Sequence, residues 1–446
     1  MDWWVVLIVL LFGLILVMLA GVPIAFSFLI VSGLVIYFGN NFGMTAYGFK
    51  GLQQMILGMR NVLCNFNFTP IPFFVIMGEV FFRSGIIIST MDVLSKLVRK
   101  VPGRLSVVTL LGGGIFAALS GSSLANTAMF GSLMMPEMMR RGYSKGLTAG
   151  TIIASGALAM IIPPSNQAVI LGGIANISIS KILLGSIGPG ILLLLMYLVY
   201  VIVICKRKPE LAPVQNDIIA DVKPSEKIAM ILKDIVPLAF IFLVVIGIIF
   251  TGVGTATEAA AFGALAAYIL PIFYRKFNFR LLVDTLIGSL KTTGMLMLIV
   301  AGSAGFSQVL AMTGASREAV LAVTSTVDSK MLVLFIMLLI AFTVGLFVEQ
   351  AAIMMICIPL FMPLVIAYEI NQIWFAVIFL IVLQIGQFTP PVGMSLFAMK
   401  SVSPPEVTMN HIIVGALPFV LIDVIAVFII IFIPPIVTAI PGLMIS

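Results

Sequence analysis

Two long apolar segments of this chain are each interrupted by a pair of adjacent prolines. They read ALAMIIPPSN at 157–166 and QIGQFTPPVG at 384–393. A proline inside a helix leaves a backbone carbonyl without its partner, and lipid supplies no replacement, so such a break is tolerated only beside protein or a watery cavity. Two breaks at corresponding places in two halves indicate the binding site of a secondary transporter.

The apolar content of the chain predicts a membrane protein. Hydrophobic residues make up 61% of the sequence and charged residues 9%, far from the balance of a soluble domain. The charge-free runs exceed or approach the roughly 20 residues that cross the hydrocarbon core of a bilayer. These runs are 3–49, 105–136, 146–180, 182–205, 235–257, 292–316 and 371–399. The first is too long for a signal peptide and is expected to be retained, so the predicted class is an all-α polytopic membrane protein.

The excess of basic residues is explained by topology. Lys and Arg cluster at 96–104, 140–145, 206–233 and 275–280 and give a net charge of +7, and cytoplasmic loops of membrane proteins are enriched in these residues. We therefore expect no nucleic-acid partner. His411 is the only histidine, and the three cysteines lack metal-ligand spacing. Without an HExxH motif or paired aspartates in adjacent spans, an intramembrane enzyme is not indicated.

Placing every basic cluster in the cytoplasm predicts a path for the first half of the chain. Helices near 3–20, 22–38 and 67–95 start outside and reach the cytoplasm at Lys96. The next stretch, about 105–140, has basic residues at both ends. Both ends therefore lie inside, and the stretch is predicted to be a re-entrant hairpin rather than a crossing.

The hairpin is expected to turn at LSGSS, 119–123, because glycine and serine favour turns. A broken helix at about 146–176 and a return helix at about 183–205 follow. The polar segment 206–228 is the natural boundary between the halves. Two helices within 229–282 then bring the chain back to the inside at the next basic cluster.

The second half repeats this order with the opposite orientation. A helix at about 283–312 leads to an outer loop with few charges, and a second hairpin at about 331–367 turns near Gly345. A broken helix at about 372–400 runs inward, and a last helix at about 411–434 runs outward. This order predicts an inverted-topology repeat.

The inverted repeat rests on hydropathy and charge placement, because the halves share no strong residue identity. An even number of simple crossings without hairpins is the alternative. Both chain termini are predicted to be periplasmic. The predicted organisation is N-terminal scaffold helices at 1–66, repeat 1 at 67–205, a cytoplasmic linker at 206–228, scaffold helices at 229–282 and repeat 2 at 283–446.

The predicted turn of the first hairpin carries an unusual density of small and polar residues, SGSSLANTA at 120–128. Small residues let helices pack closely in lipid, which explains the glycine and alanines but not the serines, Asn and Thr together. Their oxygens and unwound backbone carbonyls suit a hard cation such as sodium. The helix N-terminus after the turn suits an anionic group.

Four acidic residues are embedded in or near apolar segments, where ionisable groups are rare and usually functional. They are Glu79, Glu258, Glu349 and Asp423. We expect Glu258 to be the most deeply buried and to hydrogen-bond a Ser or Thr across helices. A role for Glu258 as a proton carrier is the alternative, but four scattered acids form no relay.

Four segments resemble the large membrane subunit of tripartite ATP-independent periplasmic (TRAP) transporters, in the right order and over almost the whole chain. They are GSSLANTAMFGSLMMPEMMRRGYSKG at 121–146, IIPPSNQAVILGG at 161–173, GVGTATEAAAFGA at 252–264 and TPPVGMSLF at 389–397. The chain departs from the family pattern at Asn126, Ala159 and Glu349. These departures leave open which side chains bind an ion.

The resemblance implies an elevator-type transporter of the bacterial inner membrane, with two re-entrant hairpins in a mobile transport domain held by a scaffold. It implies sodium-driven import of a small organic anion that a periplasmic substrate-binding protein delivers. A separate small four-helix membrane subunit would pack on the scaffold. The alternative is a stand-alone sodium- or proton-coupled anion carrier of the same superfamily.

The resemblance also implies about two sodium sites and one substrate site. The first sodium would be held by Ser122, Ser123, Asn126 and backbone carbonyls around Ala159, Ile162 and Pro164. The second would lie near Thr343, Gly345, Gly386, Thr389 and the carbonyl of Met394. The substrate would lie between the hairpin tips and contact Ser123, Ser165, Asn166 and Thr389.

Overall fold

The computed structural model describes residues 3–39, 47–98, 101–213 and 224–444, and this part of the chain is helical without strands. The helices before the linker are α1 (Trp3–Leu19), α2 (Ile24–Tyr37), α3 (Gly48–Leu63), α4 (Pro70–Ser84), α5 (Ile86–Leu97), α6 (Arg104–Ser120), α7 (Ser123–Arg140), α8 (Lys145–Ile161), α9 (Asn166–Ala175), α10 (Ile179–Gly185) and α11 (Ile187–Arg207). Those after it are α12 (Pro224–Asp234), α13 (Val236–Phe250), α14 (Ala256–Phe273), α15 (Phe279–Thr313), α16 (Ala315–Thr326), α17 (Lys330–Gly345), α18 (Gln350–Ala367), α19 (Gln372–Gln387), α20 (Met394–Val402), α21 (Met409–Phe432) and α22 (Pro435–Gly442).

These helices are long and apolar enough for a polytopic membrane protein. By length and composition, six of the described helices could each cross a bilayer, and up to eight spans result if each of two sharply bent helix pairs counts as one. The bent pairs join α3 to α4 and α12 to α13. The fold class predicted from composition is therefore confirmed as an all-α polytopic membrane protein.

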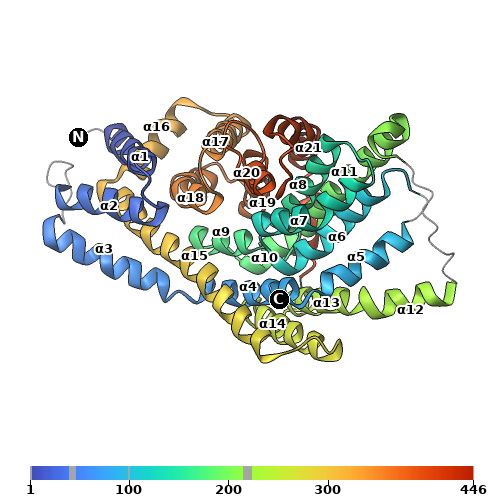
Figure 1. Ribbon diagram of the computed structural model, residues 1–446. Coiled ribbons are helices and arrows are strands. Elements are labelled where there is room, and N and C mark those ends of the chain that lie inside the picture. The colour runs from blue at the N-terminus through green and yellow to red at the C-terminus, as the bar shows by residue number, and fades with distance from the viewer. Residues whose placement is uncertain (1–2, 40–46, 99–100, 214–223, 445–446) are drawn as a thin grey trace.

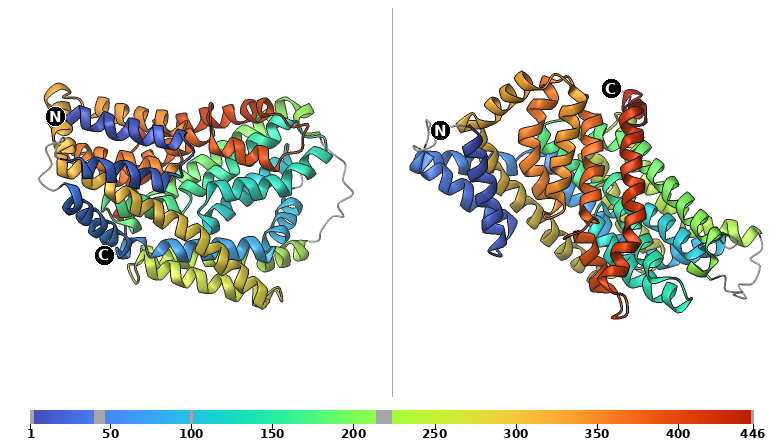
Figure 2. Two further views of the ribbon diagram at one scale, coloured as in Figure 1. Left: turned by 60° about the vertical axis from the view of Figure 1, so that its left-hand side comes forward. Right: turned by 90° about the horizontal axis from the view of Figure 1, so that it is seen from above.

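The helices form two packed groups (Figure 1). In the first group, α15 packs against α2, α3 and α4, and α14 packs against α4 and α13. In the second group, α8 packs between α6, α7 and α21, and α19 packs against α17, α18 and α21. Helices α1, α2 and α3 lie at one end of the molecule and α11 and α12 lie toward the other (Figure 2).

The two halves share one order of elements. Helices α4 and α5 meet at Gly85, and α15 and α16 meet at Gly314; both glycines have a positive φ, of 64° and 70°. A helical hairpin follows in each half, α6–α7 and α17–α18, and then a helix broken at a proline pair, α8–α9 and α19–α20. Both Pro–Pro bonds are cis. The predicted order helix, hairpin, broken helix, helix is therefore present twice.

Several helices differ from the prediction. The single helix predicted at 67–95 is two helices, because Gly85 ends α4 in a left-handed conformation. Helix α16 replaces part of the predicted outer loop, and α3 and α22 were not predicted. A search of the sequence for charge-free runs does not find α3 and α16, because both helices are amphipathic and carry charges on their exposed faces.

Helix α8 forms the centre of the second group. Every residue from Leu147 to Ile161 is buried. The close approach of α8 to α21 depends on small residues, because a Cβ at Gly150 would collide with the backbone of Gly415 on α21. The break at the end of α8 is thereby held inside the protein rather than in lipid.

Candidate functional site

The tip of the first hairpin touches the first break directly. Helix α6 ends at Gly121, which has a φ of 58°, and Ser122 caps α7 by accepting a hydrogen bond from the amide of Ala125 at 3.4 Å. A Cβ at Gly121 would lie 3.0 Å from the carbonyl oxygen of Pro164 and 3.0 Å from the amide nitrogen of Asn166. Only glycine satisfies both the left-handed backbone and this contact.

Two helices begin at this contact. Ser165 caps α9 by accepting a hydrogen bond from the amide of Ala168 at 3.3 Å, as Ser122 does for α7. The N-terminus of a helix presents unpaired backbone N–H groups and a partial positive charge. The meeting of α7 and α9 is therefore suited to an anionic group.

Polar side chains at the tip are only partly satisfied. The hydroxyl of Ser120 donates to Oδ1 of Asn126 at 2.8 Å. Nδ2 of Asn126, Oγ1 of Thr127 and Oδ1 of Asn166 are buried without a hydrogen-bond partner among the described residues. Because an unpaired buried polar atom costs free energy, these atoms mark a place where a bound ion or molecule would supply the missing partners.

A cavity of about 300 Å³ opens beside the tip. It lies between the first hairpin on one side and α4 and α15 on the other. Its polar lining residues are Glu79, Ser120, Ser122, Ser132, Asn126, Asn166 and Thr292. Three residues predicted for the sites therefore line one cavity, while Ser123 and Ser165 are buried behind it.

The backbone residues predicted for the first sodium lie around the break. Pro164 contacts the hairpin through its carbonyl, as described for Gly121. Ala159 is fully buried near the end of α8. The side chain of Ile162 packs on the other side, against Gly190 of α11, where an added Cβ would lie 2.9 Å from its Cγ1.

In the second half of the chain, backbone contacts bring together residues predicted for the second sodium site. A Cβ at Gly386 would lie 2.9–3.0 Å from the backbone of Gly345, so α19 and the end of α17 are in direct contact. Thr389 follows α19 and its hydroxyl donates to the carbonyl of Ile385 at 2.6 Å. Met394 begins α20 and is 37% exposed.

Thr343 is less well placed to bind an ion than the other residues predicted for the second sodium site. Its side chain is exposed, and its hydroxyl donates to the carbonyl of Leu339 within α17 at 2.8 Å. The tip of the second hairpin instead reaches the first half, because Nε2 of Gln350 donates to the sulfur of Met160 at 2.9 Å. Sequence reasoning missed Gln350, which follows the embedded Glu349 at the start of α18.

The prediction for the embedded acids was wrong for Glu258. Its side chain is exposed and forms a capping box with Thr255 on its own helix, with Oε2 accepting from the Thr255 amide at 2.7 Å. The fully buried acid is Asp423. Its oxygens accept hydrogen bonds from the hydroxyl of Tyr197 and, at 2.9 Å, from Nε2 of Gln384. An apolar run can contain the exposed start of a helix, which composition does not distinguish from its interior.

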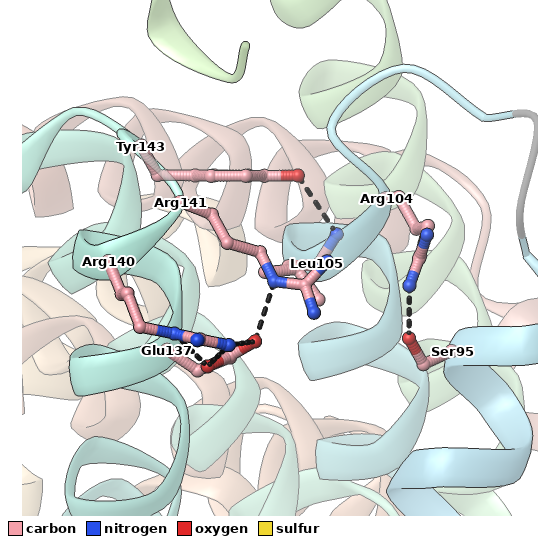
Figure 3. A network of polar contacts seen from close by, with 7 residues as sticks. All are labelled: Ser95, Arg104, Leu105, Glu137, Arg140, Arg141 and Tyr143. Atoms are coloured by element: carbon pink, nitrogen blue, oxygen red, sulfur yellow. Dashed lines mark hydrogen bonds and ion pairs between the residues drawn. The ribbon is translucent and has the colours of Figure 1, made fainter. Parts of the chain in front are cut away.

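The two ends of the first hairpin lie side by side (Figure 3). The amide of Leu105, at the start of α6, donates to the hydroxyl of Tyr143, just beyond α7, at 3.2 Å. Glu137 accepts hydrogen bonds from Arg140 at 3.0 Å and from Arg141 at 2.6 Å. These hydrogen bonds, and above all the one from Arg140, lower the pKa of Glu137. The hairpin thus begins and ends at one basic face.

Comparison with known proteins gives one family for the whole chain. The family model described as "Tripartite ATP-independent periplasmic transporter, DctM component" matches residues 11–436. The C4-dicarboxylate TRAP transporter large permease protein DctM of Pseudomonas aeruginosa is 30% identical over 85% of this chain and 87% of its own length. The 2,3-diketo-L-gulonate TRAP transporter large permease protein YiaN of Escherichia coli K12 is 29% identical over 93% and 94%.

A solved structure shares the fold. The YdaH transporter of Alcanivorax borkumensis superposes with a TM-score of 0.60 at 14% identity, over 86% of this chain and 90% of that one. At this identity the similarity concerns the fold alone. The family model and the Pseudomonas permease show that the chain belongs to the DctM family of TRAP transporter large permease subunits.

Proposed function

We propose that this chain imports a small organic anion with sodium as the coupling ion, as the large membrane subunit of a TRAP transporter in the bacterial inner membrane. Its partners would be a small four-helix membrane subunit and a periplasmic substrate-binding protein. The observation that carries this proposal is the contact of the first hairpin with the first break, where two helix N-termini meet unpaired polar side chains beside a cavity.

An anionic substrate is supported by the electrostatics of the cavity. The N-termini of α7 and α9 supply partial positive charge. Among the described residues that line the cavity, the only acid is Glu79, which is paired with Arg83 at 2.6 Å. The two permeases compared above are named for a dicarboxylate and a sugar acid. A carboxylate would accept hydrogen bonds from serine hydroxyls and asparagine amides there.

Sodium as the coupling ion is supported by the donor chemistry. Ser122, Ser123 and Asn126 carry hydroxyl and amide oxygens at the hairpin tip, and the carbonyl of Pro164 lies against Gly121 of the same tip. Together these oxygens would suit a hard cation. In the second half, the Gly345–Gly386 contact and Thr389 would supply carbonyl oxygens. Each ion would hold a hairpin against its broken helix.

An elevator mechanism is supported by the division into two helix groups. We propose that the hairpins and broken helices move as one body and that α4, α5, α15 and α16 belong to the scaffold with the helices of 1–66 and 229–282. Helix α15 packs along α2, α3 and α4 rather than on the broken helices, although it packs on α18. The cavity lies where the two bodies meet.

Uptake by proteoliposomes tests the proposal. The chain would be reconstituted with its small subunit and binding protein, and uptake of a panel of labelled organic acids would be measured with and without an inward sodium gradient. We expect uptake of one acid to require both the gradient and the binding protein. Uptake that ignores sodium would contradict the coupling, and uptake without the binding protein would indicate a stand-alone carrier.

A proton-coupled carrier is a second candidate because of the buried Asp423. This acid lies inside the moving body, held by Tyr197 and Gln384. A pH gradient applied without sodium would drive uptake only if this candidate is correct, and Asp423→Asn would then abolish that uptake.

A further inference from the structure

One member of an ion pair on α4, Glu79, lines the candidate substrate cavity from the scaffold side, and its partner Arg83 is bonded to it. Glu79 and Arg83 lie one turn apart, with Nε of Arg83 donating to Oε2 of Glu79 at 2.6 Å. Glu79 lines the cavity of about 300 Å³ together with Ser122 and Asn166 of the moving body. Ionisable groups within apolar helices are rare and usually functional.

The guanidinium of Arg83 is only partly used by this pair. A carboxylate can bind two guanidinium nitrogens at once, yet the hydrogen bond to Glu79 uses Nε alone. Among the described residues, no acceptor is bonded to the two terminal nitrogens of Arg83. The side chain is 37% exposed.

Helix α15 holds the pair in place. A Cβ at Gly288 would lie 2.8 Å from Oε2 of Glu79 and 3.0 Å from Nη2 of Arg83, so the ends of both side chains rest against α15 at this glycine. One turn further along α15, Thr292 lines the same cavity. Helices α4 and α15 pack against each other (Figure 1). The partly exposed pair therefore lies on α4 where this helix meets α15.

We propose that Arg83 receives the acidic group of the substrate when the first hairpin stands beside α4, and that Glu79 holds the guanidinium when the substrate is absent. This inference rests on the proposed function and names a specificity-determining residue for it. A guanidinium binds both carboxylates and sulfonates through its planar set of donors. A substrate without an acidic group could not displace Glu79.

The exchange also explains why an acid lines an anion site. Without Arg83, the carboxylate of Glu79 would repel the substrate. With Arg83, the two acidic groups compete for one guanidinium, so the substrate is accepted on the scaffold side but not retained there. Return of Glu79 to Arg83 would favour release.

The test compares Glu79→Gln, Arg83→Gln, Arg83→Lys and the double variant Glu79→Gln/Arg83→Gln in reconstituted transporter with both partners. The probes are labelled succinate, 2,3-diketo-L-gulonate, N-acetylneuraminate and isethionate, and each variant is assayed with the acid that the unaltered protein takes up. We expect Arg83→Gln to reduce uptake about tenfold or more, because one charge-assisted hydrogen bond is lost and a repulsive carboxylate remains. Arg83→Lys should retain part of the uptake.

The sign of the Glu79 effect separates this proposal from a structural ion pair. We expect Glu79→Gln to keep uptake and to lower the half-saturating substrate concentration, because the competitor for Arg83 is gone. Uptake by the double variant should exceed uptake by Arg83→Gln, because the double variant lacks the repulsive carboxylate of Glu79. The matched control is Arg280→Gln/Asp284→Asn, a pair on α15 outside the cavity with a 3.6 Å separation, which should leave half-saturation unchanged.

Equal losses of uptake and of thermal midpoint for Glu79→Gln and Arg83→Gln would overturn the proposal in favour of a structural pair. Unchanged uptake by Arg83→Gln would overturn it as well. If the unaltered protein took up no organic acid of the wider panel under a sodium gradient, the proposed function itself would fail, and this inference with it.

Discussion

The two hairpins of this chain meet their broken helices in chemically different ways. At the first hairpin, polar side chains of Ser120, Ser122 and Asn126 surround the contact. Buried polar atoms of Asn126, Thr127 and Asn166 lack a hydrogen-bond partner within the described part of the chain. At the second, Gly345 meets Gly386 backbone to backbone. A duplicated architecture can thus carry one site built from side chains and another built from main-chain carbonyls and close packing.

The tips differ in the same way. Ser122, a neutral hydroxyl, caps α7, whereas Glu349, an acid, caps α18 by accepting from the amide of Ala351 at 2.8 Å. The carboxyl group of Glu349 already occupies the helix N-terminus of the second tip. The first tip therefore leaves its positive helix end free for a substrate anion, and this asymmetry predicts unequal responses to substitution.

The largest effect is expected at the glycine contact of the second site. Gly386→Ala would place a Cβ 2.9–3.0 Å from backbone atoms of Gly345, which cannot rotate away. We expect α17 and α19 to separate, with a loss of about 1–3 kcal/mol in stability and most of the uptake. Thermal unfolding in detergent and proteoliposome uptake would measure both. Gly247→Ala in α13, where nothing lies within 4 Å, is the control, and equal stability of the two variants would contradict the contact.

A smaller effect is expected at the side-chain site. Ser122→Ala and Asn126→Ala each remove an oxygen from the proposed first sodium site without adding bulk. We expect the sodium concentration for half-maximal uptake to rise about tenfold, as for the loss of one strong interaction. Ser325→Ala on the exposed face of α16 is the control. An unchanged sodium dependence of both variants would remove this hairpin from the list of ion sites.

The smallest effect is expected at Thr343. Its exposed hydroxyl is bonded within α17, so Thr343→Val should change the sodium dependence less than twofold. Thr389→Val, at the second break, should change it more. A large effect of Thr343→Val would show that the second site also depends on side-chain oxygens and would weaken the contrast between the hairpins.

The membrane orientation of the two hairpins can be compared directly. Ser144 lies beyond the end of the first hairpin and Ser329 precedes the second. With the exposed Cys64 replaced by serine, Ser144→Cys should react with an impermeant thiol reagent only from the cytoplasm, and Ser329→Cys only from the periplasm. Labelling of both from the same side would contradict the inverted repeat.

Sequence reasoning located the elements that composition marks strongly. The proline pairs at 163–164 and 390–391 end helices where predicted, and both hairpins lie within a few residues of their predicted bounds. It missed the short charged helices α3 and α16. It also missed the end of α4 at Gly85, because this glycine lies within an apolar stretch that predicts a single helix.

The residues of the candidate site come from two kinds of signal. The resemblance named Ser122, Asn126 and Asn166, and these three residues line one cavity, while their roles in binding stay predictions. The contributions of Glu79 and Thr292 depend on how α4 and α15 pack against the hairpin, which no local pattern encodes. The burial of Asp423 likewise depends on α11 and α19.

Crosslinking across the cavity tests the central claim, that one helix group moves past the other. Phe82→Cys on α4 and Ala125→Cys on α7, both exposed and both lining the cavity, would be joined by bismaleimides of graded length that can be cleaved by reduction. Lys145→Cys and Glu406→Cys, whose parent residues lie within the moving body and are linked by a 3.0 Å hydrogen bond, serve as the control pair. The account predicts that the first crosslink stops uptake until it is cleaved while the control crosslink does not. Full uptake by the transporter crosslinked between α4 and α7 would contradict a rigid-body elevator and favour local gating around a fixed site.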